Sequence, residues 1–90
     1  MKDKIIKFMD EYNINNYVIN DDMSVDITSD IDLSGNSIID FPFKFNKVIG
    51  DFDCSDNNLT SLLNIPNYIG GSCYLFENEL THIDFIPYEN

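Results

Sequence analysis

The sequence predicts a small, mostly-β repeat solenoid, in which parallel strands are joined by extended return limbs and capped by an N-terminal α-helix and β-hairpin. Two observations lead to this prediction. A short pattern of apolar residues recurs three times at intervals of 21 residues, and an amphipathic helical pattern precedes the first copy. We expect residues 1–29 to form the cap and residues 30–90 to form three 21-residue repeats, the last incomplete, within a single domain.

The cap begins with an amphipathic helix, predicted for residues 3–12. Apolar side chains at i, i+3, i+4 and i+7 from Ile5 form one stripe, and charged residues occupy much of the opposite side. Asp3 is placed to act as the N-cap for the first free backbone amides. A short helix of this kind covers the open apolar end of a repeat array.

A β-hairpin is predicted for residues 17–27. Two β-prone segments, Tyr17–Ile19 and Val25–Ile27, flank the turn residues 20–24. We assign this hairpin to the cap, between the helix and the first repeat. The pattern does not specify which strand it pairs with in a sheet.

Each repeat is expected to contribute one strand, whose first and third residues face the core and whose second residue faces outward. The strands are expected at residues 31–33, 52–54 and 73–75. An asparagine follows each strand at a turn, where its side chain can satisfy backbone groups that a tight bend leaves unpaired. We therefore give these residues a structural role and expect them to stack as a ladder: Asn36, Asn57 and Asn78. Proline in the return limbs favours an extended chain over a helix.

Counted from the strand, each copy has apolar residues at its first, third, eighth and eleventh positions and asparagine at its sixth. This is the leucine-rich-repeat signature. Residues 30–90 resemble short bacterial leucine-rich repeats, and residues 53–62 are also similar to repeat proteins common in bacteriophage genomes. The third copy departs from the pattern, with Leu75 and Phe76 where the second has Cys54 and Ser55. The resemblance implies that the protein binds a partner on a concave strand face. It also suggests the hypothesis that the protein is a phage-encoded inhibitor of a host nucleic-acid-binding defence enzyme.

Acidic residues dominate the charge of the chain. Sixteen Asp and Glu residues stand against five basic ones, for a net charge of −11, and residues 51–90 contain no Lys or Arg. This field repels nucleic acid and anionic membranes, so neither is an expected direct partner. It attracts proteins with a basic surface. The alternative explanation is solubility, since net charge keeps small domains dispersed.

The outward strand positions stack into columns about 4.8 Å apart, which creates an acidic face that becomes aromatic toward the C-terminus. The expected columns are Asp30–Asp51–Ser72, Asp32–Asp53–Tyr74 and Ser34–Ser55–Phe76, with the face extended toward the cap by Asp26. The candidate partner-binding residues are Asp26, Asp30, Asp32, Asp51, Asp53, Tyr74, Phe76 and Glu77. Aromatic residues beside charges are common in binding hot spots. The alternative is a solvated β-surface on which aspartate serves only solubility.

No grouping of residues indicates an enzyme. His82 is the only histidine; it lies in a variable repeat position, and the repeat register places it on a different face from Cys54. The aspartates lack a pocket that would raise a pKa, and no glycine-rich phosphate loop is present. The Asp columns lack the Asp-x-Asp-x-Asp-Gly arrangement of a calcium loop. We therefore expect no catalytic residues, no metal and no cofactor.

Cys54 and Cys73 occupy inward repeat positions and are expected to be reduced core thiols; a disulfide between adjacent strands is open to them but is not indicated by the pattern. Reduced thiols agree with a cytoplasmic address, which is the host cytoplasm if the protein is phage-encoded. The sequence shows no apolar run long enough to cross a bilayer and no secretory signal.

The last strand, near residues 72–76, is expected to present an unpaired edge, because the sequence ends part-way through a return limb. Such an edge pairs readily with another chain unless the tail, residues 87–90, folds over it. The alternative function is therefore a structural domain that self-associates into a homo-oligomer through this C-terminal edge.

Overall fold

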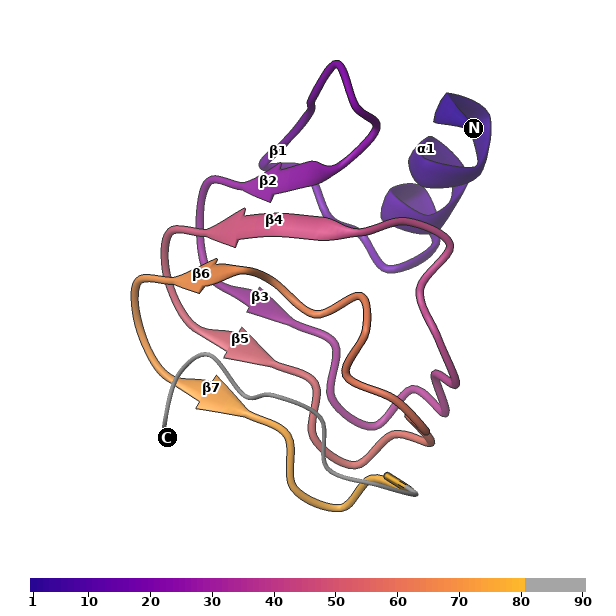
Figure 1. The fold of residues 1–90 in the computed structure, drawn as a ribbon, viewed down its shortest axis with the longest axis vertical. Helices are drawn as coiled ribbons and strands as arrows, with labels where there is room; N and C mark the ends of the chain where they lie inside the picture. Colours follow the sequence, from indigo (N-terminus) through magenta and orange to yellow (C-terminus); the bar gives the residue numbers. More distant parts are fainter. Residues whose placement is uncertain (81–90) are drawn as a thin grey trace.

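The computed structural model describes residues 1–80, in which one helix precedes seven short strands (Figure 1). The helix is α1 (Lys2–Glu11). The strands are β1 (Tyr17–Ile19), β2 (Val25–Ile27), β3 (Ile31–Asp32), β4 (Phe45–Val48), β5 (Phe52–Asp53), β6 (Tyr68–Ile69) and β7 (Cys73–Tyr74). The molecule is small, compact and mostly sheet. The expected third return limb, His82 and the tail at residues 87–90 lie outside the described residues.

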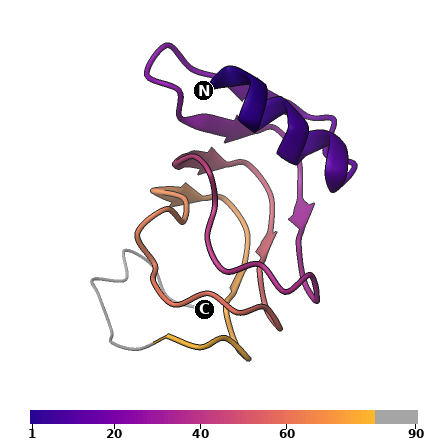
Figure 2. The same cartoon turned by 90° about the vertical axis from the view of Figure 1, so that its right-hand side faces the viewer.

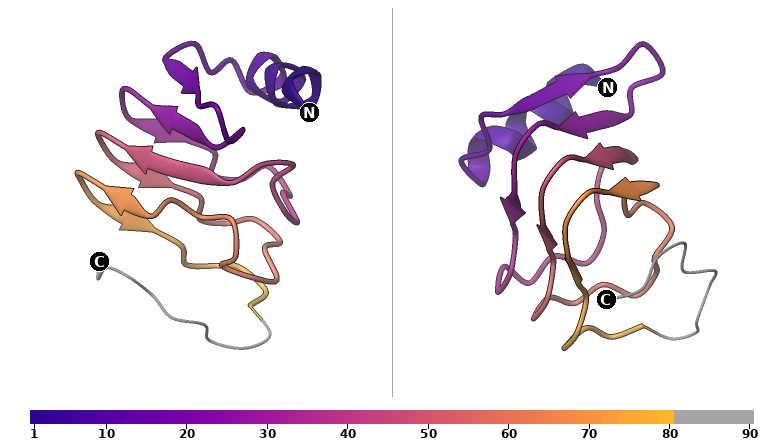
Figure 3. Two further views of the ribbon diagram at one scale, coloured as in Figure 1. Left: turned by 45° about the horizontal axis from the view of Figure 1, so that its top comes forward. Right: turned by 90° about the vertical axis from the view of Figure 1, so that its left-hand side faces the viewer.

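The strands form two sheets, and successive turns of the chain pass from one sheet to the other. One sheet has the order β1-β2-β4-β6, in which β1 and β2 are antiparallel and the other pairs are parallel. The other sheet has the order β3-β5-β7 and is parallel throughout. In it, Ile31 lies beside Phe52 and Phe52 beside Cys73, so neighbouring strands keep the 21-residue interval of the sequence pattern. Figure 3 shows the successive turns of the chain lying one behind another.

The hairpin expected at residues 17–27 is present, and the structure shows the pairing partner that the sequence left open. Strand β2 also pairs in parallel with β4, and β4 pairs with β6, so the hairpin supplies the first two strands of the larger sheet. The return limbs were expected to be extended, but strands β4 and β6 within them were not predicted. Strand β4 does not show a simple alternation: two buried apolar residues flank half-buried Asn46 and exposed Lys47.

Helix α1 lies with the hairpin at one end of the molecule (Figure 2) and buries the apolar stripe expected from its sequence. Ile5 and Met9 are fully buried. The N-cap expected at Asp3 is wrong: the helix begins at Lys2, and Asp3 lies within its first turn, where a carboxylate still interacts favourably with the free amides. Within the described residues, no helix has the length and apolar character needed to cross a membrane.

A chain of phenylalanines joins the helix to both sheets. The ring centroids of Phe8 on α1 and Phe43 are 5.3 Å apart, and those of Phe43 and Phe45 on β4 are 4.8 Å apart. Phe45 in turn contacts Phe52 on β5 at 5.5 Å, and all of these pairs are close to edge-to-face. Phe45 and Phe52 are fully buried. Such contacts add to the stabilisation from apolar burial, so this cluster fixes the helix and the two sheets as one body.

The turn asparagines bond to the backbone of their own turn and of the neighbouring one. Asn57 is buried; its Oδ1 accepts the amides of Asn36 and Ile38 at 3.0 and 2.9 Å, and its Nδ2 donates to the carbonyls of Leu33 and Ser55. One turn later, Asn78 accepts one amide, that of Leu59, and donates to the carbonyls of Cys54 and Leu75. Asn36 donates to the end of its own strand. These bonds connect each turn of the chain to the next.

The two cysteines are free and buried, as expected for core thiols. Burial, with smaller contributions from Asp53 and Cys73, raises the pKa of the Cys54 thiol from 9.0 to about 12. We expect both thiols to resist iodoacetamide at pH 8 in the folded protein and to react within minutes after unfolding in guanidinium chloride, since only the exposed thiolate is nucleophilic. Mass spectrometry of the alkylated chain measures this; rapid labelling of Cys54 under native conditions would contradict its burial.

The raised pKa also predicts the pH dependence of stability. A proton bound more tightly by the folded state contributes stability that is fully present below pH 9, the unfolded value, and is lost as pH rises toward the folded value of about 12. Replacing Cys54 by alanine is expected to flatten this decline in urea melts between pH 9 and pH 11.

Candidate functional site

The outward side chains of the three-stranded sheet form the candidate site, which we call the strand face. The register places Asp32 beside Asp53 and Asp53 beside Tyr74. Neighbouring strands of a sheet lie about 4.8 Å apart, so these three side chains form one row across the sheet. The sequence predicted this row. Asp32 and Tyr74 are exposed, and Asp53 is half-buried.

Asp32 and Asp53 each use one carboxylate oxygen to shape the turn that follows their strand. Oδ1 of Asp32 accepts hydrogen bonds from the backbone amide and the hydroxyl of Ser34, at 2.9 and 2.6 Å. Asp53 accepts the same pair from Ser55, at 3.0 and 2.6 Å. The hydrogen bonds from Ser34 lower the pKa of the Asp32 carboxyl below its usual value, because they stabilise the charged form. No described residue donates to Oδ2 of either aspartate, which leaves these oxygens for a partner.

The bonds to serine are turn chemistry and not in themselves a sign of binding. Asp22 in the hairpin turn accepts the amide and hydroxyl of Ser24 with almost the same geometry, 2.9 and 2.6 Å. An aspartate two residues before a serine commonly closes such a turn. What distinguishes the strand face is therefore the stacking of two such carboxylates side by side.

Asp30 and Asp51 each accept a backbone hydrogen bond, a role that was not expected from the sequence. Oδ1 of Asp30 accepts the amide of Asp51, and Oδ1 of Asp51 accepts the amide of Ser72, both at 2.8 Å. Each carboxylate lies across a glycine of the next turn, Gly50 or Gly71, and a Cβ on either glycine would overlap with the carboxylate oxygen. In the sequence, this arrangement could have been inferred from the glycine that precedes each bonded amide, in the pairs Gly50-Asp51 and Gly71-Ser72.

Two aromatic side chains extend the strand face beyond the carboxylates. Tyr74 is 40% exposed and Phe76 is 62% exposed, with ring centroids 6.5 Å apart in an edge-to-face arrangement. Glu77, also exposed, follows with a left-handed backbone at φ 58°. In contrast, Ser55 is 4% exposed and does not contribute to the face as its column was expected to.

Asp26 does not belong to the strand face. It lies on β2, in the four-stranded sheet, and its Oδ1 accepts a hydrogen bond of 2.9 Å from Asn46 on β4. The expectation that it extends the face toward the cap is wrong, because the chain turns from one sheet into the other between β2 and β3. The sequence pattern does not reveal that turn, since apolar and polar residues alternate in the same way in both strands.

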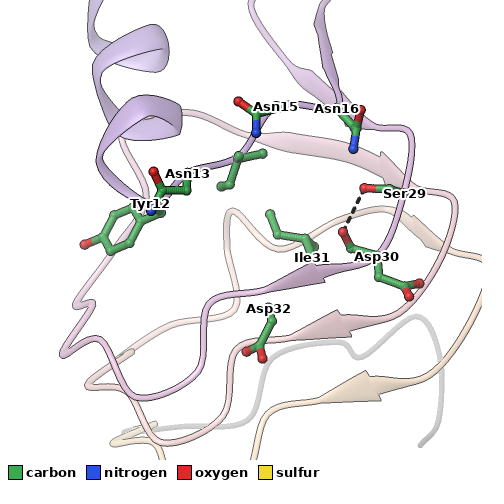
Figure 4. Close-up of a pocket in the computed structure, with 9 residues that line it drawn as sticks. Tyr12, Asn13, Asn15, Asn16, Ser29, Asp30, Ile31 and Asp32 are labelled. Carbon is green, nitrogen blue, oxygen red and sulfur yellow. Dashed lines mark hydrogen bonds between the residues drawn. The ribbon is translucent and has the colours of Figure 1, made fainter.

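A polar groove of about 160 Å³ lies beside the strand face, between β3 and the loop that follows α1. Its walls are residues 12–16 on one side and residues 29–32 on the other (Figure 4). A groove at this position was not expected from the sequence. Asn13 has a left-handed backbone at φ 57°, which turns the chain back toward β3.

The basic residues that the structure places lie away from the strand face. Lys44 is on the return limb, where its Nζ donates to the carbonyls of Leu63 and Ile65, and Lys47 is on β4 in the other sheet. The remaining lysines lie within α1. Within residues 1–80 no group of three or more His, Cys, Asp or Glu side chains is arranged to hold a metal ion. Comparisons with protein-family models, with curated proteins and with solved structures found no match to this chain.

Proposed function

We propose that this chain is a leucine-rich-repeat solenoid that acts as a non-enzymatic binding module, using its strand face to bind a basic surface of another protein. One observation carries the proposal: the free Oδ2 atoms of Asp32 and Asp53 lie in one row with the exposed ring of Tyr74, on a face without a lysine. The solenoid assignment is supported by the 21-residue register of the parallel strands and by the asparagine bonds between turns.

The charge arrangement favours a cationic partner. Two carboxylates about 5 Å apart repel each other by roughly 1–3 kcal/mol at effective dielectric constants between 80 and 20. A lysine or arginine placed between Asp32 and Asp53 removes this repulsion and adds attraction. The net charge of −11 also steers basic proteins toward the chain, and this long-range effect weakens as salt shortens the screening length.

The aromatic pair supplies the apolar part of the interface. Tyr74 and Phe76 expose large side chains at one side of the acidic row, and aromatic anchors beside charged groups dominate many protein interfaces. Their faces also attract cations, arginine in particular. The combination suits the phosphate-binding surface of a nucleic-acid-binding enzyme, which presents Arg and Lys where the carboxylates would lie.

The test compares two double variants that remove the same charge. Asp32→Asn with Asp53→Asn keeps the Oδ1 acceptors of both turns; Asp10→Asn with Asp21→Asn removes two exposed charges from α1 and the hairpin turn. The probe is a fluorescent peptide of alternating lysine and valine, followed by anisotropy at low and high salt. We expect about tenfold weaker binding for the face variant, from two exposed charge pairs at about 0.7 kcal/mol each, and no more than twofold for the control.

Three further outcomes are informative. Equal weakening in both variants would show attraction to the overall charge and would contradict a site on the strand face. Binding that does not change with salt would contradict the electrostatic argument. Retention of only the protein itself from a bacterial lysate, with a concentration-dependent mass in light scattering, would support the self-associating alternative instead.

A further inference from the structure

Strand β3 is a terminal strand of its sheet, and its outer edge faces the polar groove. The amides of Ile31 and Leu33 donate to the carbonyls of Asp51 and Asp53 on β5, at 2.9 and 2.8 Å. Successive residues of a strand direct their backbone groups to opposite sides, so the amide and carbonyl of Asp32 point away from β5. Neither group has a hydrogen-bond partner among the described residues.

The groove leaves room beside these two groups. Its volume of about 160 Å³ would hold about five waters, at roughly 30 Å³ for each. Its far wall carries the side-chain amides of Asn15 and Asn16, and Figure 4 shows both labelled residues on the loop across from β3. The floor includes Ile14 and Ile31, which belong to or pack against the apolar core. The site therefore offers amide donors and acceptors above an apolar base.

We propose that an extended segment of the basic partner adds to the sheet at the outer edge of β3, bonding through its backbone to the amide and carbonyl of Asp32. This inference rests on the proposed function and specifies how the partner is held. A residue opposite Asp32 projects on the same side as its carboxylate, and the residues before and after it project toward Ile14 and Ile31. The segment is therefore expected to alternate basic and apolar residues.

Charge selects this occupant over a second copy of the chain. A copy carries the same net charge of −11, and its own strand face would meet Asp30 and Asp32 with like charges. A basic segment places its charges beside these carboxylates. Peptides that add a strand to a sheet edge gain affinity from backbone hydrogen bonds and specificity from alternate side chains. At β3 the backbone of Asp32 would supply the affinity, and its carboxylate would supply the specificity for basic residues.

The test uses the pentapeptide Lys-Val-Lys-Val-Lys and two N-methylated forms, one methylated on its lysines and one on its valines. Backbone amides of an added strand point alternately toward and away from β3, so methylation in one register removes a bond and in the other does not. We expect one form to bind fivefold to tenfold more weakly than the unmethylated peptide and the other to bind within twofold. Equal affinities for both methylated forms would overturn the inference.

Amide hydrogen exchange of Asp32 provides an independent readout. The amide is expected to exchange rapidly in the free protein and at least tenfold more slowly with the saturating unmethylated peptide. Asn15→Trp, which fills the groove from its outer wall, should abolish this protection, whereas Asn67→Trp, on the return limb, should preserve it. Protection that survives Asn15→Trp would place the peptide elsewhere.

The outcomes separate this inference from the proposed function. One outcome is that the peptide binds more weakly to the Asp32→Asn, Asp53→Asn variant but does not protect the Asp32 amide in the wild-type protein. This outcome would support binding on the strand face and contradict pairing at the edge of β3. Absence of binding by the unmethylated peptide at millimolar concentration, together with no salt-sensitive retention of basic proteins, overturns both.

Discussion

Replacing Phe45 by alanine is expected to lower the free energy of unfolding by about 4 kcal/mol, within the range of roughly 3–5 kcal/mol for a buried phenylalanine. The side chain is fully buried, and its ring lies within 5.5 Å of the rings of Phe41, Phe43 and Phe52. Its loss opens a cavity between the two sheets, which the remaining rings on the segment before β4 and on β5 are too fixed by packing to fill. Urea unfolding followed by circular dichroism measures the change.

The matched control for this prediction is Ile39→Ala. Ile39 is an apolar residue of the same chain segment, but it is 64% exposed. Its replacement should change stability by no more than about 0.5 kcal/mol. A similar loss in both variants would contradict the central position of Phe45. For a small domain with roughly 5 kcal/mol of total stability, Phe45→Ala should leave a large unfolded fraction at 37 °C.

Replacing Asn57 by alanine is expected to lower the free energy of unfolding by about 3 kcal/mol. The amides of Asn36 and Ile38 lose the acceptor that they share in the folded protein, and each amide left unsatisfied costs roughly 1–3 kcal/mol. The carbonyls bound by Nδ2 lose less, because those of Leu33, Cys54 and Ser55 each keep another donor.

The other asparagines provide an internal scale. Asn78 is half-buried and accepts the single amide of Leu59, and Asn36 is exposed and acts only as a side-chain donor. We therefore expect the loss on alanine substitution to fall in the order Asn57, Asn78, Asn36. Urea melts of the three variants with an unchanged slope would establish this order. An Asn36 variant as unstable as the Asn57 variant would contradict the role of the shared acceptor.

Several features could be predicted because they depend on residues close in sequence or on a strict period. The helical stripe from Ile5, the hairpin at residues 17–27 and the row of Asp32, Asp53 and Tyr74 all follow from spacing alone. A 21-residue interval that places equivalent residues in register also predicts which side chains neighbour each other across strands. This is why most of the strand face could be named before its geometry was known.

The larger sheet could not be predicted, because its parallel strands depend on residues that are distant in the sequence and poorly patterned. Strand β4 has polar residues at its two central positions, and β6 has only two residues. Their pairing with β2 is set by the stacking of successive turns of the chain. The wrong assignment of Asp26 to the strand face has the same origin, since Asp26 lies on β2 in the larger sheet.

The sequence by itself determined the interval of the repeats, the inward and outward alternation of the strands and the excess of negative charge, since each depends only on residue type and spacing. Tertiary structure alone decided which backbone amides each carboxylate binds. Oδ1 of Asp30 and of Asp51 accepts an amide of the next turn, whereas Oδ1 of Asp32 and of Asp53 accepts an amide of its own turn. It also decided that the loop after α1 stands apart from β3 and leaves an edge with unpaired backbone groups, because the position of that loop depends on packing across the whole core.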